Sequence, residues 1–277
     1  MLVENSKCVG CGNCVAVCPM GAIHVADRLA HINQDECVEC GSCLRFVTSE
    51  DAPAWLVRLV RGFFSFLNVR YDQPIDLCPA GALYESDLEW PRTLRAEFSN
   101  TLVVHPSTGG GGRGTEEIKT NDATNRLPPG RAGVLVEFGR PGVGCRFHEV
   151  QKVTRVMARI EDLSFEPKNP VTALMKDTST GDLDPDVLNE KFLSCILEML
   201  MPLTRVAEAL ETVKQVAPEL DTVISLVVNG RCGPDGEIPY EEMVKQAGFT
   251  MRPNGKTNLG LARRTDPQKE PAEAATV

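Results

Sequence analysis

Eight of the 11 cysteines in this chain of 277 residues fall into a pattern that can bind metal. Cys8, Cys11 and Cys14 stand three residues apart, and Cys18 follows them with Pro19 directly after it. A thiolate is a soft ligand that suits iron and sulfide, and this spacing lets a tight loop turn several sulfurs toward one centre. The C-x2-C-x2-C-x3-C-P run therefore predicts ligands of an iron–sulfur cluster.

The pattern occurs a second time. Cys37, Cys40 and Cys43 have the same spacing, and a second Cys-Pro pair stands at Cys78, beyond an insertion that covers residues 44–77. The segments that begin at the two Cys-Pro pairs, CPMGAI and CPAGAL, are similar. This repetition indicates an internal duplication.

The repeated run also predicts which cysteines share a cluster. In domains with two such runs, the fourth cysteine of each run binds the other cluster. We therefore expect two [4Fe-4S] clusters, the first bound by Cys8, Cys11, Cys14 and Cys78, and the second by Cys37, Cys40, Cys43 and Cys18. Two structural zinc sites are the alternative.

Regular elements must position these cysteines. Apolar and polar residues alternate over residues 23–32, which predicts a hairpin. In the insertion, apolar residues from Trp55 to Leu67 recur at helical spacing, with Arg58 and Arg61 among them. The sequence leaves three roles open for this helix: packing against the protein core, docking a partner subunit, or lying on a membrane surface.

Composition divides the chain into four parts. We expect a two-cluster domain at residues 1–91, a Gly/Thr/Pro-rich linker at 92–131, an α+β domain at 132–264 and a disordered tail at 265–277. The linker formally contains G-x-G-x-x-G, but no apolar helix follows these glycines, so no dinucleotide fold is expected there.

The second domain shows alternating strand and helix signals. A buried strand is expected at residues 133–139, further strands at 171–175 and 221–230, and helices at 148–160, 184–200, 203–217 and 240–248. An Asn-Gly turn at residues 254–255 predicts a further hairpin. The fold class expected is α+β: a dicluster domain with a helical insertion, followed by an α/β sandwich, with a ferredoxin-like βαββαβ layout as the first choice.

Bulk properties exclude several classes of protein. The net charge of −9, without a basic patch, argues against a nucleic-acid partner. No apolar run is long enough to span a membrane, and the first residues lack the features of a secretory signal. Many cysteines in such a chain indicate metal binding rather than disulfides. We expect a cytoplasmic protein that works under anaerobic conditions, because low-potential clusters are often sensitive to oxygen.

Two resemblances extend this interpretation. Residues 1–85 resemble bacterial-type two-[4Fe-4S] ferredoxin domains. Most of the chain is also similar to the family of 6-hydroxynicotinate reductase and related ferredoxin-containing reductases, through EWPRTLRAEFS, GRGTEEIKTNDAT, FGRPGVGCRFHEV, NPVTALMKDTSTG, VLNEKFLS and RPNGKTNLGLAR. The second resemblance implies reduction of a hydroxylated pyridine ring with reduced ferredoxin as the donor. Flavin is reported in that family, although this chain carries no flavin motif.

Three functions follow from these features. The first is an electron-transfer protein or subunit that serves a redox partner or a larger oxidoreductase complex, and the sequence leaves a homo-oligomer open. The alternative is a ferredoxin-dependent reductase, with substrate contacts drawn from His105, Arg113, Glu116, Glu117 and Lys119. In the third, the clusters only stabilise the fold. No nucleophile–base pair is recognisable, so the catalytic residues stay unknown.

Overall fold

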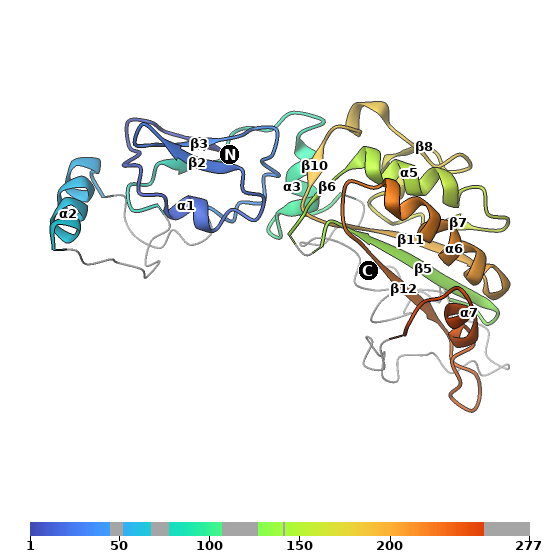
Figure 1. Cartoon of the computed structure of the whole chain (residues 1–277). Helices are drawn as coiled ribbons and strands as arrows, with labels where there is room; N and C mark the ends of the chain where they lie inside the picture. Colours follow the sequence, from blue (N-terminus) through green and yellow to red (C-terminus); the bar gives the residue numbers. More distant parts are fainter. Residues whose placement is uncertain (45–51, 68–77, 107–126, 141, 252–277) are drawn as a thin grey trace, which may run out of the picture.

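A computed structural model describes residues 1–44, 52–67, 78–106, 127–140 and 142–251. Two hydrophobic clusters organise it. A small cluster surrounds the N-terminal cysteines, and a much larger one fills the second half of the chain. Figure 1 shows the corresponding two parts, with the cysteine-rich part at one side and a sheet covered by helices at the other. The expected mixture of helix and strand is thus confirmed.

The cysteine-rich part consists of short elements around the loops that carry the two cysteine runs. Strand β1 (Leu2–Val3) pairs with β4 (Leu83–Tyr84), and helix α1 (Asn13–Ala16) carries Cys14. The hairpin predicted at residues 23–32 is confirmed as β2 (Ile23–Ala26) and β3 (Leu29–Ile32). Its turn residues, Asp27 and Arg28, both have positive φ, as a two-residue hairpin turn requires.

The helix predicted in the insertion is confirmed as α2 (Ala54–Phe66), with Pro53 directly before it. Proline suits this position because it lacks the N–H group that the start of a helix leaves without an intrahelical partner. Residues 45–51 and 68–77, on either side of the helix, lie outside the described residues.

The linker predicted at residues 92–131 is wrong for its first part. Thr93–Ser99 form helix α3, in which Leu94, Arg95 and Phe98 are buried. Phe98 packs edge-on against Phe147, and the Ser99 hydroxyl accepts a hydrogen bond from the Leu193 N–H at 2.9 Å. The helix therefore packs against the second domain. Residues 107–126 lie outside the described residues.

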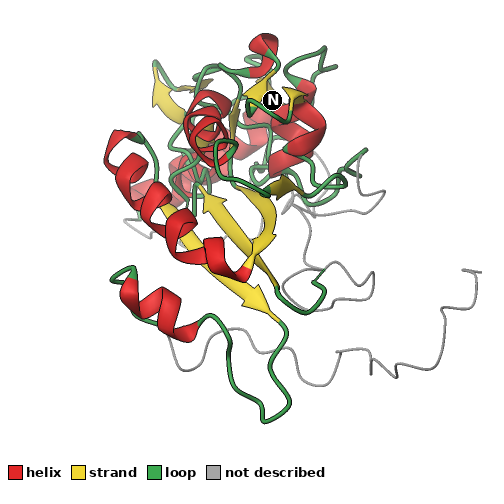
Figure 2. Cartoon of the chain, turned by 90° about the vertical axis from the view of Figure 1, so that its right-hand side faces the viewer, coloured by secondary structure: helices red, strands yellow, loops and turns green. Residues whose placement is uncertain are grey.

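The second domain is built on a four-stranded antiparallel sheet. Its strands are β5 (Arg131–Phe138), β7 (Ser164–Phe165), β11 (Cys195–Pro202) and β12 (Ile224–Gly230). The order across the sheet is β12-β5-β11-β7. Helix α5 (Phe147–Met157) lies between β5 and β7 in the chain, and α6 (Val206–Val216) lies between β11 and β12. Figure 2 shows the helices lying across the sheet.

Alternate strand residues build the main core. Val134, Val136 and Phe138 of β5 belong to the same buried cluster as Leu197 and Met199 of β11 and the apolar sides of α5 and α6. The residues between them point to the other face of the sheet, where Leu135 and Ile196 are also buried. Both faces of the central strands are therefore covered.

Two predictions for the second domain are wrong. The first is the strand predicted at residues 171–175. Residues 172–174 instead form a 3-10 turn before strand β8 (Met175–Asp177), which pairs with β9 (Asp182–Leu183). The helix predicted at residues 184–200 is only one turn long, Pro185–Val187, and β10 (Lys191–Phe192) and β11 follow it. Because β11 is buried on both faces, its apolar run does not alternate, and such a run fits a helix as well as a strand.

The remaining predicted elements of the second domain are confirmed. They are the strands β5 and β12, the helices α5 and α6, and the short helix α7 (Glu241–Gln246). Strand β6 (Cys145–Arg146), which pairs with β10, was not expected. The Asn-Gly turn at 254–255 and the tail at 265–277 lie outside the described residues. In the part of the chain that the structure describes, no helix is long and apolar enough to cross a bilayer.

Candidate iron–sulfur centre

The first cysteine run comes together with the distant Cys78. Cys14 is buried, and burial raises the pKa of its thiol to about 11, with further contributions from the neighbouring Cys11, Cys78 and Cys8. Cys8 and Cys14 belong to the small hydrophobic cluster of this part, and Cys78 packs against that cluster although it is far away in the sequence.

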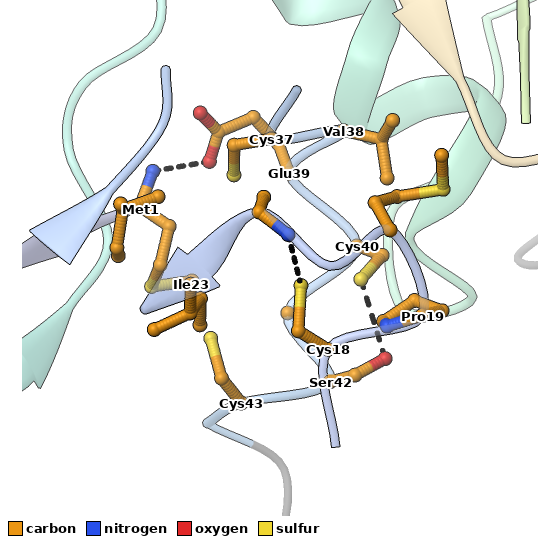
Figure 3. A pocket seen from close by; sticks show the side chains of 14 residues that line it. Met1, Cys18, Pro19, Ile23, Cys37, Val38, Glu39, Cys40, Ser42 and Cys43 are labelled. Atoms are coloured by element: carbon orange, nitrogen blue, oxygen red, sulfur yellow. Dashed lines mark hydrogen bonds and ion pairs between the residues drawn. The ribbon is translucent and has the colours of Figure 1, made fainter. Parts of the chain in front are cut away.

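The second run gathers around Cys18 in the same way. Burial raises the pKa of the Cys43 thiol to about 12, with further contributions from Cys40, Cys37 and Cys18. The same four cysteines line one cavity, whose walls otherwise consist largely of apolar side chains such as Ile23 and Val38 (Figure 3).

The two Cys-Pro segments have equivalent local geometry. The Ala22 N–H donates a hydrogen bond to the Cys18 sulfur at 3.2 Å, and the Ala82 N–H donates one to the Cys78 sulfur at 3.1 Å. In each case the donor is four residues after the cysteine. Hydrogen bonds of this kind stabilise a ligating thiolate and influence the potential of a cluster.

A close approach of two loops holds the first run. Gly10 has φ of +64°, and a side chain there would meet the Arg28 carbonyl oxygen at 2.4 Å. Nearby, the Ala30 N–H of the hairpin donates to the Cys8 sulfur at 3.3 Å. Glycine is required at position 10 because it tolerates positive φ and leaves room for the hairpin turn.

These residues fit an iron–sulfur group. Each of the two sets offers four soft sulfur donors among apolar side chains, and several sulfurs already accept backbone hydrogen bonds. The raised pKa values mean that the Cys14 and Cys43 thiols are protonated at neutral pH in the metal-free chain. Metal binding must therefore displace these protons, so it is linked both to pH and to folding.

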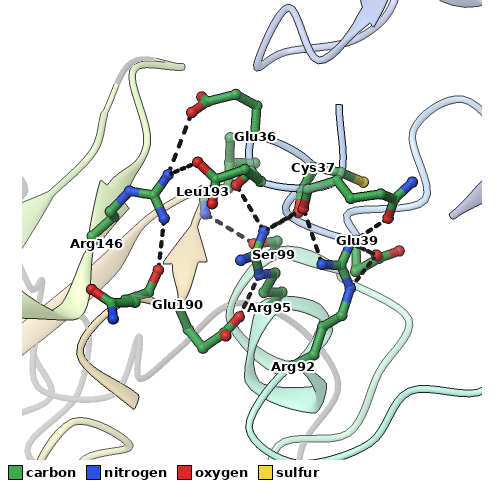
Figure 4. Close-up of polar contacts among 12 residues, drawn as sticks. Glu36, Cys37, Glu39, Arg92, Arg95, Ser99, Arg146, Glu190 and Leu193 are labelled. Carbon is green, nitrogen blue, oxygen red and sulfur yellow. Dashed lines mark hydrogen bonds and ion pairs between the residues drawn. The ribbon is translucent and has the colours of Figure 1, made fainter. Parts of the chain in front are cut away.

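Arg95 of α3 and Arg92, the residue directly before this helix, hold the loop of the second run (Figure 4). Arg95 is buried and donates from one nitrogen to the carbonyl oxygens of Gln34, Asp35 and Cys37 at 2.8–3.0 Å. Arg92 donates to the Glu39 carboxylate at 2.6 Å.

Glu39 is itself an important part of this loop. It lies between Cys37 and Cys40 in sequence, and its buried carboxylate pairs with both Arg92 and the amino group of Met1. Burial raises the pKa of this carboxyl group, but the hydrogen bonds and charges of its two partners outweigh burial and hold the pKa below its ordinary value. A buried carboxylate is stable only with such partners.

The second domain also contacts this loop directly. Arg146 donates to the Asp35 carboxylate at 2.8 Å, Lys191 pairs with Glu36, and Glu190 pairs with Arg95. The paired strands β6 and β10 supply Arg146 and Lys191. Sequence reasoning missed all of these polar residues. The only signal was an arginine on the otherwise apolar side of the segment that forms α3.

Helix α2 contacts the loop of the first run. Arg58 donates to the Cys8 carbonyl oxygen at 3.0 Å, and Arg61 donates to that of Cys11 at 3.4 Å. Arginine side chains thus donate hydrogen bonds to both cysteine runs, from α2 to the first run and from α3 to the second.

Of the five predicted substrate contacts, only His105 lies within the described residues. His105 is buried, and its ring packs edge-on against Phe98 at 4.9 Å between centroids. Arg113, Glu116, Glu117 and Lys119 lie outside the described residues. The cysteines beyond the two runs include buried Cys145 and Cys195, whose thiol pKa values are raised by burial, and exposed Cys232.

The fold and the two thiol sets define the class of the N-terminal part as a ferredoxin-type iron–sulfur domain. Residues 1–46 match the family model of the 4Fe-4S dicluster domain. Iron–sulfur proteins of the ferredoxin class are therefore the relatives of this part of the chain. The match ends before Cys78.

Curated relatives are similar over this same region. The chain is 49% identical over 37 residues to a subunit of the ion-translocating oxidoreductase complex of Methanosarcina acetivorans, which is 13% of this chain and 14% of that protein. It is 41% identical over 39 residues to ferredoxin YfhL of Escherichia coli, covering 14% and 45% of the two chains. It is 32% identical over 59 residues to pyruvate synthase subunit PorD of Methanothermobacter marburgensis, covering 21% and 63%.

The matched region is less than two thirds of each of these relatives. No solved structure matches the chain.

Proposed function

We propose that this chain is an electron-transfer protein or subunit, which carries low-potential electrons through two [4Fe-4S] clusters to or from a partner oxidoreductase. The first cluster is bound by Cys8, Cys11, Cys14 and Cys78, and the second by Cys37, Cys40, Cys43 and Cys18. The observation that carries the proposal is the cavity that Cys18 shares with the second run. Relatives named as subunits of redox enzymes support it.

The clusters would supply the redox chemistry, and the chain's own residues would position and tune them. The N–H groups of Ala22, Ala30 and Ala82 hold sulfur atoms, while Arg92 and Arg95 fix the loop of the second run. Two clusters in one small domain give an electron a path between two faces of the protein. Reduction adds negative charge to a cluster, and hydrogen bonds to its sulfurs favour the reduced state.

The second domain would serve as a docking and positioning unit. Its chain order β5-α5-β7-β11-α6-β12 and its sheet order support a ferredoxin-like βαββαβ fold, a layout that does not itself imply a cluster. Because its Arg146 and Lys191 contact Asp35 and Glu36, a partner bound to this domain would lie near the second cluster.

The proposal is tested on the full chain, purified and reconstituted without oxygen. We expect about eight irons and eight sulfides per chain, and electron paramagnetic resonance of two interacting [4Fe-4S] clusters after reduction. Bound zinc, or only one cluster, would contradict it. The same preparation tests the reductase alternative, because reduction of a hydroxylated N-heteroaromatic ring by the chain alone would favour an enzyme over a carrier.

A further inference from the structure

Helix α2 is oriented with its polar side toward the protein. Its arginines, Arg58 and Arg61, donate to carbonyl oxygens in the loop of the first cysteine run, and Val57 is buried. The large apolar side chains point away from this contact. We call six of them the outer face of α2: Trp55, Leu56, Leu59, Val60, Phe63 and Phe66.

The outer face is unusually exposed for a soluble protein. Phe66 is 85% exposed, Trp55 65% and Leu59 61%. Together the six side chains expose on the order of 700 Å², above the largest apolar patch of a typical monomer. At 3.6 residues per turn they cover an arc of about 140°, and no polar residue lies within it. Such a surface needs an occupant.

We propose that the occupant is a membrane surface, with α2 lying in the plane of the interface and its outer face among the acyl chains. The helix has 13 residues and is about 20 Å long, too short to span a bilayer but suited to lie on one. Figure 1 shows α2 at the end of the molecule away from the second domain.

Charge favours a lipid surface over a protein groove. The segment that the structure describes around α2, residues 52–67, contains two arginines and no acidic residue, in a chain of net charge −9. Both arginines donate to neutral carbonyl oxygens, so within the described residues no carboxylate neutralises the positive charge of this segment. A helix that binds in a protein groove carries a narrow stripe of apolar anchor residues bordered by polar ones, whereas this face is broad and uniformly apolar.

The role of the membrane in electron transfer rests on the proposed function, because it requires the first cluster. Since α2 contacts the loop of Cys8 and Cys11, the membrane would lie close to the first cluster. Electrons would then be exchanged with a partner at the membrane through that cluster, while the second cluster faces the second domain.

The test is flotation of the reconstituted full chain with vesicles of phosphatidylcholine, with and without phosphatidylserine. We expect the chain to float with the vesicles, more strongly when they contain phosphatidylserine and less at high salt. The chain has two tryptophans, so a Trp90→Phe variant leaves Trp55 as the only indole reporter. The fluorescence emission of Trp55 should shift to shorter wavelength when vesicles are added, and lipids brominated in the acyl chains should quench this emission.

A double variant, Leu59→Glu with Phe63→Glu, should weaken vesicle binding at least about tenfold, because two side chains that would enter the acyl chains become charged. The matched control is Leu102→Glu, another exposed leucine (76%) outside α2, which should bind like the parent chain. Iron content and visible absorption show that each variant keeps its clusters. Iron content tests the proposed clusters, and flotation tests membrane binding by α2. The two proposals can therefore fail separately, since vesicle binding needs no electron transfer.

Two results would overturn the inference. One is a chain that stays unbound at every lipid concentration, with unchanged Trp55 emission. The other is a dimer in light scattering that Leu59→Glu with Phe63→Glu converts to a monomer, because a second copy would then occupy the outer face.

Discussion

The guanidinium group of Arg95 donates a hydrogen bond to the carbonyl oxygen of Cys37 at 2.8 Å. Arg95 belongs to α3, which packs against the second domain, whereas Cys37 begins the second cysteine run. The same side chain is only 5% exposed and pairs with Glu190 of the second domain. This arginine therefore joins the loop of the second cysteine run, α3 and the second domain in one polar contact.

Replacement of Arg95 by Met should destabilise this junction. It leaves Glu190 without its partner and removes donors from three loop carbonyls, so we expect a loss of about 3–5 kcal/mol in the free energy of unfolding. The second cluster should also lose iron to a chelator faster than the first, as followed by absorption and electron paramagnetic resonance.

Arg155→Met provides the control for this variant. Arg155 pairs with Asp182 at the surface, where ion pairs contribute about 0–1 kcal/mol. Equal sensitivity of the two variants to denaturant and chelator would show that Arg95 does not hold the loop.

Replacement of Cys18 or Cys78 by Ala tests the exchange of fourth ligands. Each variant should lose one cluster and retain about four irons per chain. In Cys18→Ala the surviving resonance should be that of the first cluster, and in Cys78→Ala that of the second. Cys232→Ala, at an exposed cysteine outside both sets, should keep the full iron content. Loss of the same cluster in both variants would refute the assignment.

Replacement of Phe147 by Ala tests how α3 is attached. The Phe147 ring is fully buried between Phe98 of α3 and Phe192 of β10. Its removal leaves a cavity and should cost about 3–5 kcal/mol in urea unfolding followed by circular dichroism. Leu102→Ala, at an exposed position, should change stability by less than about 0.5 kcal/mol. If α3 were a free linker, the region around Phe98 would be equally protected from hydrogen exchange in both variants.

The pH dependence of stability can be predicted for Glu149 in α5. Burial raises the pKa of its carboxyl group, but hydrogen bonds from Lys152 and from the Asp221 N–H, both at about 3 Å, outweigh burial and hold the pKa below its ordinary value of 4.5. A lowered pKa in the folded state stabilises the protein above the unfolded pKa, and this contribution is lost as the pH falls through the folded pKa.

A Glu149→Gln variant measures this contribution. At neutral pH it should be less stable than the parent by roughly 1–3 kcal/mol, because a buried charge-assisted contact is lost. The difference should shrink as the pH falls below 4.5. The clusters of both chains are equally sensitive to acid, so this sensitivity cancels in the difference between their free energies of unfolding at each pH. A difference that is constant across this range would contradict the prediction.

Short-range patterns predict the proposed cluster ligands and several of the regular elements. Two cysteine runs with fixed spacing predict the clusters because the ligands within each run are close in sequence. The hairpin at residues 23–32 and the helices α2, α5 and α6 were also predictable, since apolar residues recur in each with the period of a strand or a helix.

Tertiary structure decided what these patterns leave open. Strand β11 was mistaken for a helix because it is buried on both faces, so its apolar residues carry no period. The contacts of Arg95, Arg146 and Lys191 with the second cysteine run join residues that are 58 or more positions apart, and no local pattern links them. The sequence also predicted an amphipathic α2, but its apolar side faces outward because the first run offers carbonyl oxygens that bind arginine.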